Sequence, residues 1–298
     1  MKKNGHTGGI TAVPFVPTAG ALPGAEVIDF PRLLDRAGRR GVDVTRPVRL
    51  GFHELITVRE GELRCSVDFT AYTLRPGGWL WVWPEQIVQY EAGHTDCDGR
   101  LVVFSAGFPG AATDRLIRDA EYGAGRLITP PDAVQAPLTA TLDALEAEYG
   151  GVLGLPLEAR AETMRNLLSV ILIRLAHLAN QGRPEPSGHG TFQKFRQAVE
   201  EGFTRTHSVH AFAAQLGYSE RTLTRATRAA TGYGAKRHID DRVLLEAKRL
   251  LAHTGLTSGA VGARVGFTHA TAFHAFFRHR MGMTPTEFRR LLHQVHLP

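Results

Sequence analysis

The sequence is poor in cysteine and in long apolar runs, and each shortage excludes a class of protein. Only Cys65 and Cys97 occur among 298 residues, so no disulfide framework is expected and a reducing compartment is favoured. No run approaches 18 consecutive apolar residues, which argues against a membrane span. The first residues lead into Gly, Thr and Pro rather than into the apolar core of a signal peptide. We therefore expect a cytoplasmic protein, long enough for two domains.

Positive charge is concentrated in the C-terminal third. Residues 190–298 hold 16 Lys and Arg against 7 Asp and Glu, whereas the rest of the chain holds 19 against 22. A basic segment beside a slightly acidic one indicates that one domain meets a polyanion and the other does not. A solvated basic surface without a partner is the alternative, and charge alone does not decide between them.

The N-terminal half reads as a small β-structure. Residues 1–24 are rich in Gly, Thr and Pro and are predicted to form a disordered arm. Residues 25–132 alternate short apolar runs with turns, and this spacing predicts a small barrel or sandwich. The expected strands are Arg49–Arg59, Leu63–Phe69, Trp79–Trp83 and Arg100–Phe104.

Two helices are predicted within the next segment, residues 133–180. They are Ala136–Tyr149 and Leu157–Leu178, and the second carries apolar residues at every third or fourth position. That stripe packs either onto the barrel or into a homodimer seam, and the pattern leaves both open. The Gly-, Pro- and Ser-containing stretch 181–190 predicts an interdomain linker.

Two segments of the C-terminal third repeat one another. Leu216-Gly217-Tyr218-Ser219 matches Val265-Gly266-Phe267-Thr268, 49 positions further on. Each copy reads as a short helix, a Gly turn, a hydroxyl residue at an N-cap position and a second helix. This order is typical of the helix-turn-helix, whose second helix enters the major groove of DNA.

Further helices complete an all-α domain over 191–298. An apolar stripe predicts a connecting helix over Ala235–His253, with Phe192–Thr206 before the first repeat and Pro285–His293 after the second. A connector of about 20 residues spans roughly 30 Å. Successive major grooves on one face of B-DNA recur at about 34 Å, so both second helices are expected to reach adjacent grooves of one duplex.

The second helix of the first repeat presents the richer set of base-reading side chains. Arg221, Thr224, Arg225 and Arg228 share one face, and an arginine fork fits the O6/N7 edge of guanine. In the second repeat Thr268 is the expected cap, and Arg278 and Arg280 are expected to hold phosphates. For any single side chain, an exposed position without a contact is the alternative. The predicted DNA-binding residues are Ser219, Arg221, Thr222, Thr224, Arg225, Arg228, Thr268, His269, Thr271, His274 and Arg278.

The C-terminal third resembles the DNA-binding domain of the AraC/XylS family of bacterial transcription regulators. The motifs are LGYSERTLTR from Leu216, AKRLLAHT from Ala247 and VGF…FFRHRMGMTPTEFR from Val265. The resemblance implies base contacts at Arg221, Thr224, Arg225, Ala270, Thr271, His274 and Ala275. Relatives often carry Arg where Ala275 stands and Ala where Gly262 stands, so the first unit is expected to dominate sequence reading.

The N-terminal part resembles the cupin-like sensor domain that often precedes this module. The matching stretches are GFHELITV, REGELRCSVDF and PGGWLWVWPEQIVQY. In metal-binding cupins a Gly and then a His follow the Pro of the second motif, whereas Glu85 and Val88 stand at those positions here. The first motif supplies only His53 and not a His pair. No metal and no cofactor are therefore expected.

A small-molecule pocket is expected in the barrel. Trp79, Trp81 and Trp83 alternate, so they point to one face of their strand and line a pocket if that face lies inside. Core packing or an interface with the helices is the alternative. The polar candidates for the pocket are His53, Glu54 and Arg64.

Together these patterns predict an α+β protein of two domains: a cupin-like β-barrel followed by helices, and an all-α domain of two helix-turn-helix units joined by a connecting helix. We expect a transcription regulator, not an enzyme, that binds double-stranded promoter DNA under control of a small-molecule effector. A homodimer is expected, and RNA polymerase is a further candidate partner. Two rivals stay open: a metal-dependent cupin-type enzyme with an appended DNA-binding module, and a constitutive DNA-binding protein whose barrel only dimerises. The effector, the operator and the choice between activation and repression stay open as well.

Overall fold

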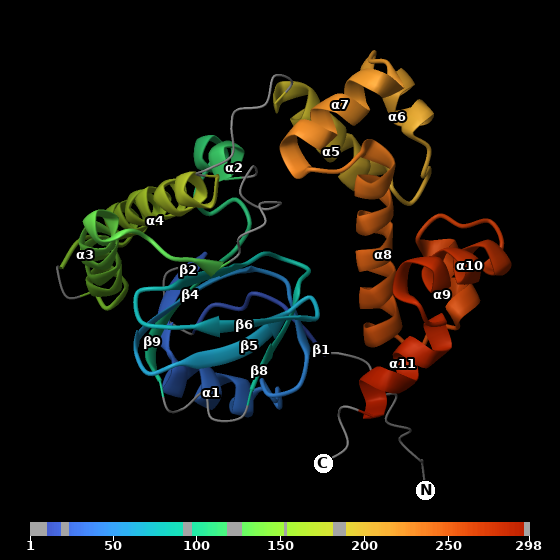
Figure 1. Ribbon diagram of the computed structural model, residues 1–298. Coiled ribbons are helices and arrows are strands. Elements are labelled where there is room, and N and C mark those ends of the chain that lie inside the picture. The colour runs from blue at the N-terminus through green and yellow to red at the C-terminus, as the bar shows by residue number, and fades with distance from the viewer. Residues whose placement is uncertain are drawn as a thin grey trace, which may run out of the picture. The chain divides into compact units, whose positions relative to one another are not determined.

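The computed structural model describes residues 11–18, 24–91, 97–117, 127–151, 154–180 and 189–294. The chain divides into two compact units, Thr11–Gln181 and Gly182–Pro298 (Figure 1). Within the described residues the first unit holds every strand and the second is helical. The predicted linker 181–190 lies outside the described residues, except for the last two positions, which already belong to a helix. None of the helices in the described part of the chain combines the length and apolarity that crossing a lipid bilayer requires.

The first unit is built on two five-stranded sheets, in agreement with the small barrel or sandwich that the strand spacing predicted. One sheet has the spatial order β1 (Thr11–Val13), β3 (Val48–Leu50), β8 (Ile87–Tyr90), β5 (Leu63–Val67) and β6 (Thr70–Leu74). The other has the order β10 (Leu127–Ile128), β7 (Trp79–Val82), β4 (His53–Glu60), β9 (Asp98–Phe104) and β2 (Ala25–Asp29). All neighbouring strands are antiparallel except β1 and β3.

The prediction of a disordered arm over residues 1–24 is wrong for part of that segment. Thr11–Val13 pairs with Val48–Leu50 as an edge strand. Thr18 then donates its backbone N–H (2.5 Å) and its hydroxyl (3.0 Å) to the carboxylate of Glu26. Residues 1–10 and 19–23 of the predicted arm lie outside the described residues.

Side-chain alternation along β4 and β7 divides the apolar residues of the barrel unit between two cores. Ile56 and Leu80 face the inner core between the two sheets, together with Phe30 of helix α1 (Phe30–Arg39). Leu55 and Trp81 face the opposite side and join an outer core under the helices. Since successive residues of a strand point to opposite faces, each central strand of this sheet is buried on both sides.

The two predicted helices cover the outer core. They are α3 (Asp132–Tyr149) and α4 (Leu157–Asn180), with the short α2 (Ala111–Ile117) beside α4. The predicted stripe of α4 is fully buried here at Met164, Leu168, Ile171 and Leu175. The stripe therefore packs onto the barrel unit, and α4 exposes a different, smaller apolar pair, Val170 and Ile173.

The second unit contains two helix-turn-helix units on one connecting helix. Its helices are α5 (His189–Gly202), α6 (Val209–Leu216), α7 (Glu220–Thr231), α8 (Ala235–His253), α9 (Ser258–Arg264), α10 (Ala270–Met281) and α11 (Pro285–Gln294). In Figure 1, α5, α6 and α7 gather at one end of α8, and α9, α10 and α11 at the other. Helix α5 begins and ends earlier than the predicted Phe192–Thr206.

The apolar stripe of α8 holds the two ends of this unit together. Ile239, Val243 and Ala247 are completely buried, and Leu251 is nearly so. Burying each of the larger side chains contributes about 1.5–3 kcal/mol to folding. At 19 residues the helix is about 28 Å long, close to the length that the sequence predicted.

Candidate nucleic-acid interface and barrel cavity

The turn between α6 and α7 is fixed by a glycine and a serine. Gly217 ends α6 with φ of 71°, a left-handed conformation that favours glycine. Ser219 then caps α7, because its side chain accepts a hydrogen bond from the backbone N–H of Thr222 (3.1 Å). The Thr222 hydroxyl lies 2.8 Å from the Ser219 hydroxyl, so both residues stabilise the start of the helix.

Helix α7 has one buried and one open face. Leu223 and Ala226 are buried, and the hydroxyl of buried Thr227 donates to the Leu223 carbonyl (2.8 Å). The opposite face lines an open groove, whose residues are Glu220, Arg221, Thr224, Arg225, Arg228 and Ala229. The four predicted base-reading residues of this helix are thus brought together on one surface.

The three arginines of this face are free to bind an anion. Among the described residues, none of Arg221, Arg225 and Arg228 has a carboxylate within ion-pair distance; the nearby Glu220 is bonded to His210 instead (3.0 Å). Unpaired guanidinium groups on a surface groove fit phosphate oxygens and guanine edges, both of which supply acceptors to the arginine fork.

The second helix-turn-helix unit, formed by α9 and α10, presents fewer side chains that can bind DNA. The predicted cap at Thr268 is wrong: His269 occupies the N-cap position of α10 and makes no side-chain cap bond. The side chain of His274 is engaged within the fold, since its Nε2 lies 2.9 Å from the hydroxyl of Ser258 on α9. Arg280 pairs with Asp241 of α8, which holds it away from the phosphate role expected for it.

Three other residues predicted to bind DNA in the second helix-turn-helix unit remain accessible. His269, Thr271 and Arg278 are exposed, and no carboxylate among the described residues lies within ion-pair distance of Arg278. Among the described residues, the second helix-turn-helix unit therefore offers one arginine without an ion pair on α10, against three on α7.

The glycine at position 262 in α9 has a packing reason. A Cβ at buried Gly262 would lie 2.8 Å from Cβ and 2.9 Å from Cγ of Phe273 on α10. The small residue therefore makes room for a large, fully buried one, and the two helices approach closely. The sequence pattern alone indicated only a loss of helix propensity at this position.

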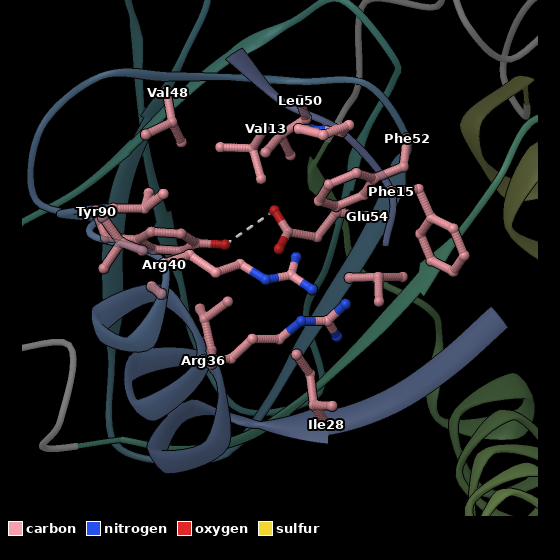
Figure 2. A pocket seen from close by; sticks show the side chains of 16 residues that line it. Val13, Phe15, Ile28, Arg36, Arg40, Val48, Leu50, Phe52, Glu54 and Tyr90 are labelled. Carbon is pink, nitrogen blue, oxygen red and sulfur yellow. Dashed lines mark hydrogen bonds between the residues drawn. The ribbon is translucent and has the colours of Figure 1, made fainter. Parts of the chain in front are cut away.

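A small cavity of about 60 Å³ lies in the barrel, lined mainly by apolar side chains (Figure 2). Figure 2 shows Glu54 and Tyr90 pointing toward one another within it. The Tyr90 hydroxyl donates to Oε2 of Glu54 at 2.9 Å, and this is the only hydrogen bond of the Glu54 side chain within the described structure. Burial raises the pKa of Glu54 to about 7, against the smaller opposing effect of the Tyr90 hydrogen bond.

The rim of the cavity is basic and is covered by the N-terminal segment. Arg36 of α1 and Arg40, the C-cap of that helix, extend toward the cavity (Figure 2), and both donate to the backbone carbonyl of Val16. Arg36 is also paired with the buried carboxylate of Glu26. Phe15 lies among the lining residues. The segment 11–18 thus closes over an apolar space whose deepest polar group is Glu54.

Of the six residues predicted for this pocket, only Glu54 lines the cavity. The three tryptophans belong to the outer core under the helices, so their placement in a barrel pocket is wrong and the alternative, an interface with the helices, is confirmed. Arg64 lies outside as well, since its guanidinium is exposed and donates to Glu62 (2.8 Å).

His53 is buried on the same outer side as the tryptophans. Its ring stacks on Phe104 at 4.7 Å and lies 4.9 Å from Trp83. Burial lowers the pKa of His53 to about 4, so the ring is neutral at neutral pH. Its neighbour Glu54 points the opposite way because adjacent strand residues alternate, so only one of these two predicted pocket residues can line the cavity.

Tyr90, Arg36 and Arg40 line this cavity and were not predicted from the sequence. Tyr90 ends β8, for which no separate strand was predicted. Arg36 lies in the last turn of α1 and Arg40 is the C-cap of that helix, which was not predicted either. Within the described residues, no group of three or more His, Cys, Asp or Glu side chains is arranged to hold a metal ion.

Both the barrel unit and the helical unit are similar to known protein families. Residues 36–167 match the family model of the AraC-like ligand binding domain, and residues 212–291 match that of a helix-turn-helix domain. The HTH-type transcriptional activator RhaR of Salmonella schwarzengrund strain CVM19633 is 27% identical over 125 residues, which are 42% of this chain and 44% of that protein. The alignment thus spans less than half the length of this curated relative.

Two solved structures are also similar. An AraC-type transcriptional regulator from Chromobacterium violaceum matches 36% of this chain and 96% of its own, with 22% identity and a TM-score of 0.33. Unsaturated fatty acid bound wild-type ToxT from Vibrio cholerae strain SCE256 matches 92% and 97%, with 9% identity and a TM-score of 0.42.

The matches and the fold define a class of protein with a ligand-binding-type barrel ahead of paired helix-turn-helix units. The two family models cover more than two thirds of the chain in that order. The chain belongs to the AraC family.

Proposed function

We propose that this protein is a sequence-specific, DNA-binding transcription regulator controlled by a small molecule bound in the N-terminal barrel. The observation that carries the proposal is the capped helix α7, with Arg221, Arg225 and Arg228 unpaired on one open face. Relatives named as transcriptional activators support a regulator rather than an enzyme. Promoter DNA is then the main partner.

The roles within α7 follow from chemistry. Arg221, Thr224 and Arg225 lie at the N-terminal half of the helix, the part that contacts base edges in helix-turn-helix complexes. Arg228 lies one turn further along and suits a phosphate. In the second unit, Thr271 and Arg278 make the corresponding contacts, with fewer base-specific groups.

The decisive experiment replaces Arg225 by alanine. We expect Arg225→Ala to weaken binding to a selected operator by about 1–3 kcal/mol while binding to random duplexes changes little, because a base contact is lost. Arg75→Ala is the matched control: it removes the same charge from an exposed site in the barrel unit. Fluorescence anisotropy at one fixed salt concentration measures both. Equal losses on operator and random DNA would reduce Arg225 to a phosphate contact.

For the effector we propose a small organic molecule with an apolar body and a group that donates a hydrogen bond to Glu54, such as an amine or an alcohol. Oε1 of Glu54 makes no hydrogen bond in the described structure, whereas the Arg36 charge is offset by Glu26. The present cavity of about 60 Å³ is far below the roughly 300 Å³ of ordinary ligand pockets, so segment 11–18 must move to admit a ligand of that size.

An alkylamine, an alkanol and an alkanoate of equal chain length test this class. We expect the amine or the alcohol to raise the melting temperature of the barrel, and Glu54→Leu to abolish the effect. A ligand at 100 times its Kd adds about 2.7 kcal/mol to the stability of the folded state. Preferential stabilisation by the alkanoate would instead assign recognition to Arg36 and Arg40 and contradict the role of Glu54.

We propose further that the protein acts as a homodimer through the exposed face of α4. Val170 and Ile173 are each 40% exposed on that helix, beside its buried stripe. Replacing both by glutamate is expected to give a monomer in light scattering without loss of the buried core. A dimer that survives the double substitution would place the interface elsewhere.

A further inference from the structure

The two turn glycines of the repeats are equivalent in sequence but differ in surroundings. A Cβ at Gly217 would meet nothing within 4 Å, so the turn of the first unit is open. A Cβ at Gly266 would lie 2.6 Å from the carbonyl oxygen of Thr204 and 3.0 Å from Nε2 of His207. Thr204 and His207 belong to the loop between α5 and α6. The turn of the second helix-turn-helix unit therefore packs directly against the first helix-turn-helix unit.

His207 makes the specific contact of this junction. Its Nε2 lies 2.8 Å from the carbonyl oxygen of Val265. A carbonyl only accepts, so Nε2 carries the hydrogen and donates it. The imidazole ring also packs against Phe267, with centroids 4.7 Å apart. We name the set Thr204, His207, Gly266 and Phe267 the interunit clasp.

Both sides of the clasp are anchored. In the first helix-turn-helix unit, Phe203 precedes the loop, and its ring packs against the guanidinium of Arg242 on α8. The guanidinium carbon lies 4.1 Å from the centroid of that ring. Arg242 Nε also donates to both carboxylate oxygens of Glu200 on α5 (3.0 and 2.8 Å). On the second unit, Phe267 packs against the buried Phe273 of α10 at 5.6 Å. A movement of either unit about α8 therefore has to break the clasp.

We propose that the interunit clasp fixes the angle between the two helix-turn-helix units and thereby sets the spacing of the two DNA boxes that the protein accepts. His207 is then a positioning residue, since it acts through the orientation of α7 and α10 and not by touching DNA. The proposal rests on the proposed DNA-binding function.

The physical reason is the helical geometry of DNA. Each added base pair rotates one box relative to the other by about 35° and moves it by about 3.4 Å. Two units joined only through the ends of one helix can adapt by twisting about it. Two units joined at α8 and again at the clasp cannot, so a changed spacing costs the contacts of one unit.

The test uses the full chain and duplexes derived from an operator that the protein itself selects. The boxes are kept at the selected spacing or separated by one, two or five base pairs more or fewer, and single-box duplexes are included. We expect the wild-type protein to lose at least about tenfold in affinity for one added base pair, the loss expected when contacts worth about 1.4 kcal/mol are broken. For His207→Ala we expect an affinity that varies less than about threefold between these spacings, with single-box affinity unchanged.

Two further variants make the test specific. Thr204→Ala is the matched control, because the clasp uses the backbone carbonyl of Thr204 and not its exposed side chain; it should keep the wild-type spacing profile. His207→Gln retains an N–H donor for the Val265 carbonyl and should restore part of the spacing discrimination, which a purely destabilised fold would not do.

The outcomes separate this inference from the function on which it rests. A wild-type protein with no preference for any sequence overturns the proposed function. A wild-type protein that selects an operator, together with a His207→Ala variant whose spacing profile is as steep as the wild type, overturns the clasp. Wild-type binding that is indifferent to spacing overturns it as well, and so does an equal loss on single-box and two-box duplexes.

Discussion

Replacing Glu54 by glutamine should change how the stability of the barrel depends on pH. Burial raises the pKa of Glu54 from 4.5 in an exposed chain to about 7 in the fold. The folded barrel therefore holds the Glu54 proton more tightly than the unfolded chain does. The stability that comes from this proton is complete below pH 4.5 and is lost as the pH rises through 7.

The magnitude follows from the shift. A difference of about 2.5 pKa units corresponds to roughly 3 kcal/mol between low and high pH, of which about 2 kcal/mol falls between pH 5 and pH 8. Glutamine carries no charge at any of these values, and its carbonyl can still accept the hydrogen bond from Tyr90. Glu54→Gln should therefore become more stable relative to the wild type by about 2 kcal/mol between pH 5 and pH 8.

Urea unfolding at several pH values measures this difference. All three tryptophans, Trp79, Trp81 and Trp83, lie in the barrel unit, so their fluorescence reports the unfolding of that unit alone. His53, whose pKa is lowered to about 4 by burial, titrates in both proteins and cancels in the difference. A difference between the two proteins that stays constant from pH 5 to pH 8 would refute the reasoning.

Three further predictions concern the helical unit and the cavity. Gly262→Ala should destabilise the second helix-turn-helix unit by about 1–2 kcal/mol, since overpacking against Phe273 exceeds the gain in helix propensity. Gly259→Ala on the same helix would place its Cβ at an ordinary 3.5 Å from Ala270 and should cost nothing; equal effects of the two in thermal melts would contradict this explanation. Ser219→Ala should cost about 1 kcal/mol by removing the cap of α7, whereas Ser219→Gly should cost a few tenths, and indistinguishable urea midpoints would argue against the cap. An effector should raise the melting temperature of the wild-type barrel, followed by tryptophan fluorescence, and should leave the melting temperature of the Glu54→Leu variant unchanged. A rise in both proteins would place the binding site outside the cavity.

Repetition and periodicity made much of the helical unit predictable. The matched Gly turns place α6, α7, α9 and α10 because a left-handed glycine and a helix cap are local requirements. The open face of α7 followed from spacing alone, since residues three and four apart share a side of a helix. The missed cap at Thr268 and the bond between His274 and Ser258 depend on how α9 meets α10, which no single-helix pattern contains.

The barrel was less predictable because strand alternation gives two faces without saying which one is inside. Trp79 and Trp81 of β7 and the following Trp83 share a core, as their alternation predicted. That core lies against α3 and α4, because this sheet is buried on both sides. Glu54 was identified, whereas its partner Tyr90 comes from a strand 36 residues away in the chain. The edge strand Thr11–Val13 was missed because composition indicated disorder, and pairing with β3 overrides composition there.

The central claim is that α7 and α10 grip adjacent major grooves of one duplex, held apart by α8, whose 19 residues span about 28 Å. Hydroxyl-radical footprinting of the full chain on a selected operator tests it most directly. We expect two protected windows on the same face of the duplex, about one helical turn apart, with the stronger protection under α7. A single window of one box, or uniform protection without sequence preference, would contradict it.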